Sequence, residues 1–76
     1  MIVYALLEQY DYEGSNLLDI YDSERHAMFD AEVKWKERTS CEQPPWKPTF
    51  DGKGLEMGLG YPNYVVIPKE VVTHGP

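Results

Sequence analysis

The first ten residues, MIVYALLEQY, carry apolar side chains at both alternating sets of positions. Side chains in a strand alternate between its two faces, so Val3, Ala5 and Leu7 would share one face. The other face would hold Ile2, Tyr4, Leu6, Glu8 and Tyr10. Polar residues come only toward the end of the segment, and strand-forming residue types dominate it. The pattern predicts a strand over residues 2–10.

A second strand is expected after the polar segment DYEGSN. Residues 14–16 of this segment are glycine, serine and asparagine, which turns favour. In the next residues, LLDIYD, Leu18 and Ile20 would share one face of a strand, and Leu17, Asp19 and Tyr21 would share the other. We therefore predict a hairpin that joins residues 2–10 to residues 17–22.

The segment DSERHAMFDAEVKWKER has the apolar spacing of an amphipathic helix. Asp22 or Ser23 can cap its N-terminus, and basic residues gather near its C-terminal end, where the helix dipole favours cations. The apolar stripe consists of Ala27, Met28, Ala31 and Trp35, widened by Phe29 and Val33. The two alanines indicate close approach to a sheet. The helix is expected to end near Arg38 or Thr39.

Residues 39–62 contain four prolines and four glycines, which argue against a regular helix or a central strand. We expect a long loop here, with a short strand at residues 55–59 as an alternative. The segment NYVVIPKEVV then predicts a last strand, with Pro68 at an edge or a bulge. The expected fold is α+β: one domain over residues 1–76, with one helix packed on one face of a small antiparallel sheet of three or four strands, ββαβ or ββαββ.

One helix can cover only one face of such a sheet. We expect the covered face to hold Val3, Ala5, Leu7, Leu18, Ile20, Val65 and Ile67. The other face would then hold Tyr4, Leu6, Tyr10, Leu17, Tyr21, Tyr64 and Val66, with Glu8 and Asp19 among them. This second set is too apolar for a face that only meets water. The long loop with Trp46 and Phe50, a second copy of the chain, or a partner should cover it.

Charge is unevenly distributed along the chain, whose net charge is −6. Residues 1–32 hold eight acidic residues and one basic residue. A protein that binds phosphate backbones needs clustered lysine and arginine, so we expect no direct nucleic-acid binding. An acidic half can instead be attracted to a basic surface of a protein partner, although a solvated face is the simpler interpretation.

The sequence contains no pattern that favours catalysis, and we expect no enzyme. The single cysteine, Cys41, excludes an internal disulfide and fits a cytoplasmic location. The acidic residues of the hairpin do not follow a calcium-loop spacing, and the GKG and GLG segments precede no helix, so we expect no metal and no cofactor. No apolar run approaches the length of a membrane span, and we expect no membrane contact.

Between Leu17 and Val33 the chain resembles short bacterial and phage proteins of unknown function. In that family two strands, the second ending in an aromatic residue, lead through a small polar pair into a helix with spaced alanines. The matching residues here are Tyr21, Asp22, Ser23, Ala27 and Ala31. The resemblance implies a strand-strand-helix-strand fold and a phage-type origin, which would place the protein in a host cytoplasm. It implies no activity and no site residues.

These observations favour a small acidic protein-binding module, such as a phage-type inhibitor or modulator that occupies a basic surface of a host protein. The expected partner-binding residues are Glu8, Tyr10, Asp11, Tyr12, Glu13, Asp19, Tyr21 and Trp46. Tyrosine and tryptophan are favoured in interface cores, and the acidic residues would steer association. Two alternatives remain: a homodimeric structural or accessory protein that pairs through the tyrosine-rich face, and a binder of small ligands.

Overall fold

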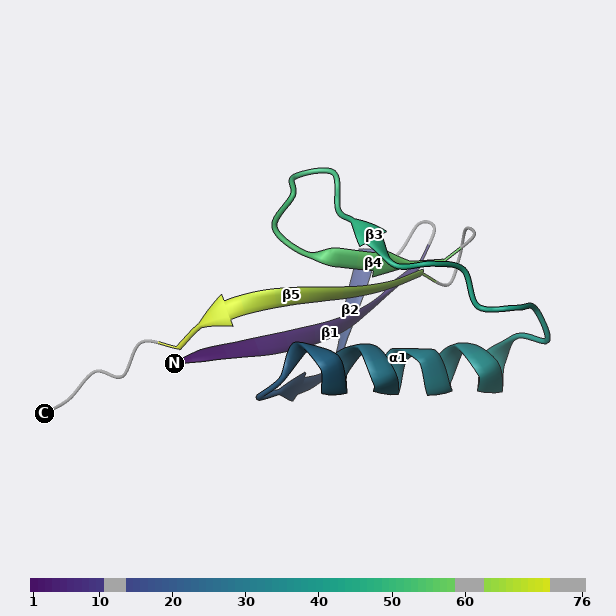
Figure 1. Cartoon of the computed structure of the whole chain (residues 1–76), viewed down its shortest axis with the longest axis horizontal. Helices are drawn as coiled ribbons and strands as arrows, with labels where there is room; N and C mark the ends of the chain where they lie inside the picture. The colour runs from purple at the N-terminus through teal and green to yellow at the C-terminus, as the bar shows by residue number, and fades with distance from the viewer. Residues whose placement is uncertain (11–13, 59–62, 72–76) are drawn as a thin grey trace, which may run out of the picture.

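The computed structural model describes residues 1–10, 14–58 and 63–71. These residues form one helix packed on a five-stranded antiparallel sheet (Figure 1). The strands are β1 (Ile2–Tyr10), β2 (Gly14–Tyr21), β3 (Lys47–Pro48), β4 (Leu55–Met57) and β5 (Asn63–Glu70), and the helix is α1 (Glu24–Arg38). The α+β class is therefore confirmed, while the expected number of three or four strands is wrong.

The strands lie in the order β2-β1-β5-β4-β3. β1 is an interior strand that pairs with both β2 and β5, for example through Ala5 with Ile20 and Ile67. The predicted hairpin of the first two strands is confirmed, but residues 14–16 begin β2 and do not form the turn. Residues 11–13, between the two strands, lie outside the described residues.

The segment expected to be a long loop contains a small hairpin. Lys47 pairs with Glu56 and Pro48 pairs with Leu55, so β3 and β4 extend the sheet beyond β5. Pro48 is tolerated because β3 is an edge strand, where a missing backbone donor costs little. Pro68 in β5 lies beyond the part of that strand that pairs with β4, so it too breaks no pairing on that side.

The helix ends lie where the local sequence places them. The side chain of Ser23 accepts a hydrogen bond from the backbone N–H of His26, at 3.2 Å, and caps the N-terminus. At the other end, the backbone N–H and the hydroxyl of Thr39 both donate to the carbonyl of Trp35. Both predicted boundaries of the helix are confirmed.

The helix covers the tyrosine-rich face of the sheet, which we had expected the long loop, a second copy or a partner to cover. The buried core between sheet and helix consists of Leu6, Ala27, Ala31, Trp35, Met57, Tyr64 and Val66, with Tyr4, Leu18, Tyr21, Met28 and Trp46 partly buried against it. The small side chains of Ala27 and Ala31 leave room between the two layers, and the large tyrosines of the sheet fill that room. The predicted assignment of the two sheet faces is therefore wrong, except for Leu18, which was expected on the covered face and does pack against the core. Phe29 and Val33, expected in the helix stripe, are exposed.

Candidate functional site

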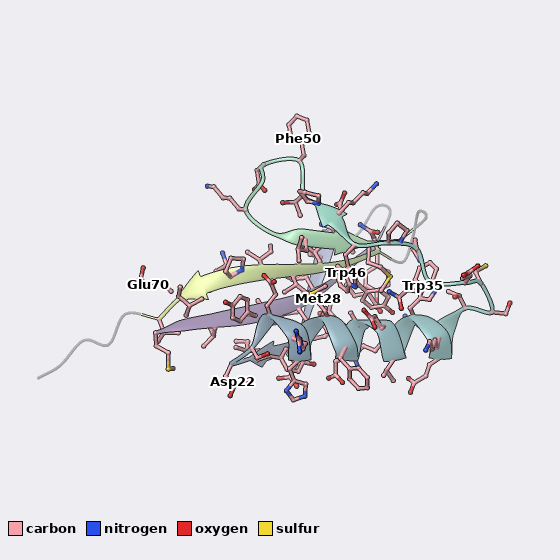
Figure 2. The ribbon with its side chains drawn as sticks, in the orientation of Figure 1. Asp22, Met28, Trp35, Trp46, Phe50 and Glu70 are labelled. Atoms are coloured by element: carbon pink, nitrogen blue, oxygen red, sulfur yellow. The ribbon has the colours of Figure 1, made fainter. Side chains whose placement is uncertain are left out.

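The tyrosine-rich face predicted to meet a partner is occupied by the protein's own helix. The hydroxyl of Tyr21 donates to the carboxylate of Asp30 on α1. The indole N–H of Trp46 donates to Oε2 of Glu32 on the same helix, at 2.9 Å. Figure 2 shows Trp46 beside Trp35 and Met28 in the layer between helix and sheet. Tyr21 and Trp46, two of the residues predicted to contact a partner, therefore contact α1 of the same chain.

Glu8, predicted as an exposed steering residue, is fully buried. Its Oε1 atom lies 3.2 Å from the guanidinium of Arg38 and also accepts a hydrogen bond from the hydroxyl of Tyr10. Arg38 comes from the last turn of α1, so the ion pair joins the helix end to β1. A buried carboxylate is stable only with such partners. Glu8 is therefore held in the interior by contacts within the chain, and half-buried Tyr10 supplies one of them.

Asp19 is the one predicted contact residue that is both described and exposed. Its carboxylate accepts a hydrogen bond from the backbone N–H of Ile20, at 2.8 Å, on the edge strand β2. The pairing register of β1 and β2 also shifts between Leu6 and Leu7, which leaves Leu18 without a partner in β1. An irregular, capped edge resists pairing with a further strand. The other predicted residues, Asp11, Tyr12 and Glu13, lie outside the described residues.

The sheet face opposite the helix carries apolar side chains that no helix or strand of the described residues covers. We call it the open face; it consists of Val3, Ala5, Leu7, Leu17, Ile20, Val65 and Ile67, which strand pairing places on the same side. Leu17 and Ile20 are 52% and 53% exposed. Ala5 and Val65 are buried among their neighbours, and the remaining three are half-buried. A contiguous apolar surface of this kind marks an interaction site more often than an isolated exposed side chain does.

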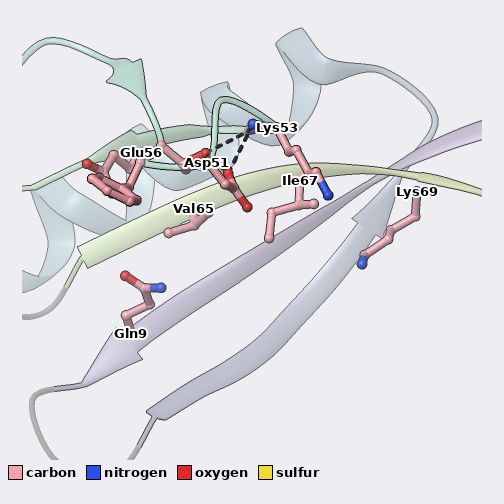
Figure 3. A pocket seen from close by; sticks show the side chains of 10 residues that line it. Gln9, Asp51, Lys53, Glu56, Val65, Ile67 and Lys69 are labelled. Carbon is pink, nitrogen blue, oxygen red and sulfur yellow. Dashed lines mark hydrogen bonds between the residues drawn. The ribbon is translucent and has the colours of Figure 1, made fainter.

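One end of the open face is hollowed into a groove of about 540 Å³. The side chains of Val65 and Ile67 lie on β5 within the groove, and Gln9 and Lys69 extend it along the sheet (Figure 3). The loop between β3 and β4, residues 49–54, forms the other side. Phe50 projects from this loop with its side chain fully exposed (Figure 2). The sequence analysis considered Trp46 and Phe50 as cover for the tyrosine-rich face; Trp46 does pack against the core on that side, whereas Phe50 does not.

Hydrogen bonds within the loop hold its shape. The backbone N–H of Thr49 donates to the carbonyl of Gly54, and the N–H of Gly54 donates to the hydroxyl of Thr49. Oδ1 of Asp51 accepts from the hydroxyl of Thr49 and from the backbone N–H of Lys53. A Cβ atom at Gly54 would lie 2.5 Å from the carbonyl oxygen of Val66, so only glycine permits this close approach to β5.

The carboxylates around the groove have partners within the chain, whereas two of the lysines do not form ion pairs with described residues. Lys47 and Glu56 face each other with 3.9 Å between Nζ and Oε1. The hydrogen bonds from Thr49 and Lys53 lower the pKa of Asp51, whose carboxylate is thereby engaged within the loop. Within residues 1–10, 14–58 and 63–71, Lys53 and Lys69 have no carboxylate at ion-pair distance. The groove therefore presents two unpaired cations beside an apolar surface.

We expected one apolar face of the sheet to remain uncovered by the helix. The structure has such a face, but it is the opposite one to the face predicted. The signal that was available is the pair Ala27 and Ala31, because a helix with small contact residues needs large side chains opposite it. Of the two alternating sets in β1, only the one with Tyr4 and Leu6 is large enough. Phe50, Lys53 and Lys69 were not predicted as site residues, since their meeting depends on a hairpin that the sequence pattern did not indicate.

No family model, curated protein or solved structure matches this chain. Among the described residues, no three His, Cys, Asp or Glu side chains lie together as metal ligands would. In that part of the chain, α1 is the only helix, and it is too short and too polar to cross a membrane. The open face with its groove is therefore the candidate functional site.

Proposed function

We propose that the protein is a small protein-binding module that works by occupying the surface of a partner, with the open face as its contact surface. The observation that carries this proposal is that the sheet leaves seven apolar side chains on a face that the helix does not cover. Both edges of the sheet are poor alternatives, because β2 is irregular and capped by Asp19, and β3 has two residues, one of them Pro48.

Net charge supports association with a partner that carries a basic surface elsewhere. Asp19, Asp22 and Glu24 are exposed on β2 and at the start of α1, with Arg25 as the only basic residue between positions 14 and 33. With a net charge of −6, the whole molecule attracts a basic partner over a distance of about 10 Å at 0.1 M salt. High salt should therefore slow association more than it speeds dissociation.

The decisive experiment compares two double variants in affinity purification from the cells that encode the protein, followed by quantitative mass spectrometry. Leu17→Thr/Ile20→Thr removes apolar surface from the open face while keeping residue types that strands favour. Phe29→Gln/Val33→Gln removes exposed apolar surface from the outer side of α1 and keeps good helix formers. Neither variant changes the net charge.

We expect a partner that the wild-type protein and the helix variant retain and that the open-face variant loses. Circular dichroism of both variants checks that the fold is intact. Loss in the helix variant alone would move the contact surface to α1. Equal retention by both variants would show that the open face does not bind the partner.

A further inference from the structure

We infer that the groove at the end of the open face binds a short extended segment of a partner protein in which an acidic side chain stands beside alternating apolar residues. This inference rests on the proposed function and specifies the chemistry of the bound segment. Lys53 and Lys69 would pair with the carboxylate, while Ile67 and Phe50 would contact the apolar side chains.

Charge complementarity is the first argument. The carboxylates that line the groove are already engaged: Glu56 faces Lys47, and Asp51 accepts hydrogen bonds from its own loop. Among the described residues, the ammonium groups of Lys53 and Lys69 have no carboxylate at ion-pair distance, and both residues are exposed. Although the lining also holds Asp51 and Glu56, this lysine pair is the charge that remains available to an incoming group. A carboxylate is the protein side-chain group that matches it.

The size of the open face is the second argument. It spans three neighbouring strands about 4.8 Å apart and about five residues of about 3.4 Å each, or roughly 240 Å². A standard interface between folded proteins takes about 800 Å² from each partner. A folded partner, a second copy of this chain included, would therefore need contacts beyond the open face, whereas an extended segment needs only a strip with anchor positions.

The loop supplies the third argument. Thr49, Asp51 and Gly54 fix it by hydrogen bonds on one side of the groove, and it holds Phe50 with its whole side chain in solvent. An aromatic side chain in this position has large apolar area and few internal contacts to lose, which are the properties of a binding anchor.

The test selects short peptides from a random mRNA-displayed library against the full-length protein and measures the affinity of the selected peptides by fluorescence anisotropy. We expect them to contain Asp or Glu next to alternating apolar residues. Lys53→Glu/Lys69→Glu should weaken binding by at least about tenfold. The control Lys34→Glu/Lys36→Glu makes the same change in net charge on α1 and should leave the affinity unchanged. Peptides whose acidic residues are replaced by lysine should bind the groove variant better than the wild type.

Outcomes separate this inference from the proposed function. Peptides that lose binding in Leu17→Thr/Ile20→Thr or Ile67→Thr but do not respond to the groove charge reversal would overturn the inference and leave the proposed function standing. Selected peptides that respond to none of these variants would contradict both. Selection of basic peptides, or of no peptides, would overturn the inference.

Discussion

Glu8 and Arg38 join the end of α1 to the middle of the sheet through one ion pair. The carboxylate is fully buried, and the side chain of Arg38 is 51% exposed. Burial of a charge is costly unless a partner of opposite charge and hydrogen bonds accompany it. Arg38 and the hydroxyl of Tyr10 supply these for one carboxylate oxygen, while Oε2 of Glu8 is buried without a hydrogen-bond partner.

Arg38→Met should lower the free energy of unfolding by about 2 kcal/mol, because it leaves a buried carboxylate without its cation. Urea denaturation followed by circular dichroism measures the change. Lys36→Met, on the same turn of the helix but without an ion pair to a described residue, should change stability by less than about 0.5 kcal/mol. Equal effects of the two substitutions would show that the ion pair with Glu8 does not stabilise the fold.

The hydroxyls of Tyr21 and Tyr64 differ in their partners. Half-buried Tyr21 donates to Asp30, whereas the buried hydroxyl of Tyr64 has no hydrogen-bond partner among the described residues. Tyr21→Phe should therefore cost about 1 kcal/mol, and Tyr64→Phe should be neutral or slightly stabilising. Thermal and urea denaturation of the two variants test this difference. A larger loss for Tyr64→Phe would mean that its hydroxyl is bonded to the neighbouring Glu8 carboxylate.

The same tyrosines predict an alkaline limit of stability. Burial and the nearby carboxylates Asp30 and Glu8 raise the pKa of Tyr21 and of Tyr64 above the ordinary value of 10.0. The unfolded chain loses these protons first, so the stability contribution is complete below pH 10 and falls as the pH rises further. The free energy of unfolding should decrease more steeply above pH 10 in the wild type than in Tyr21→Phe/Tyr64→Phe. Denaturation curves at a series of alkaline pH values measure it.

At the scale of elements, the helix and the β1–β2 hairpin could be predicted from sequence because their signals are local. Ser23 caps the helix within one turn, and strand-forming residues fill both long strands. Of the β3–β4 hairpin, β4 agrees with the short strand considered at residues 55–59, but β3 could not be predicted, since it has only two residues and contains a proline. The sequence also did not show which sheet face binds the helix, because β1 is apolar on both sides and the choice depends on packing against Ala27 and Ala31.

The β3–β4 hairpin gives a prediction at this scale. Gly54→Ala should lower the free energy of unfolding by about 2 kcal/mol, because the added methyl group meets the carbonyl oxygen of Val66 at 2.5 Å and the backbone has to move. Gly52 has a φ of 74°, which asparagine tolerates, and its Cβ would meet open space. Gly52→Asn is therefore the control, with a change below about 1 kcal/mol. If Gly54→Ala is as mild as the control, the loop does not lie against β5 as described.

At the scale of the whole molecule, the side chain of Asp19 should limit self-association, because it occupies the backbone N–H of Ile20 at the edge of the sheet. Asp19→Ala should free the backbone N–H of Ile20 and increase edge-to-edge association, measured by sedimentation velocity over a range of concentrations. Asp22→Ala removes the same charge from an exposed position beyond the strand. Association in both variants would mean that lost charge is the cause, whereas association in Asp19→Ala alone would show that the cap protects the edge.

The hydrogen-bonded loop that carries Phe50 and Lys53 also has a thermodynamic consequence. Ordering one backbone residue costs about 1–2 kcal/mol of conformational entropy, and residues 49–54 have already met this cost on folding through bonds such as that from Thr49 to the carbonyl of Gly54. A segment that docks against the loop therefore has to order its own backbone and a few side chains of the protein. Differences in affinity between related segments should then appear mainly in their dissociation rates.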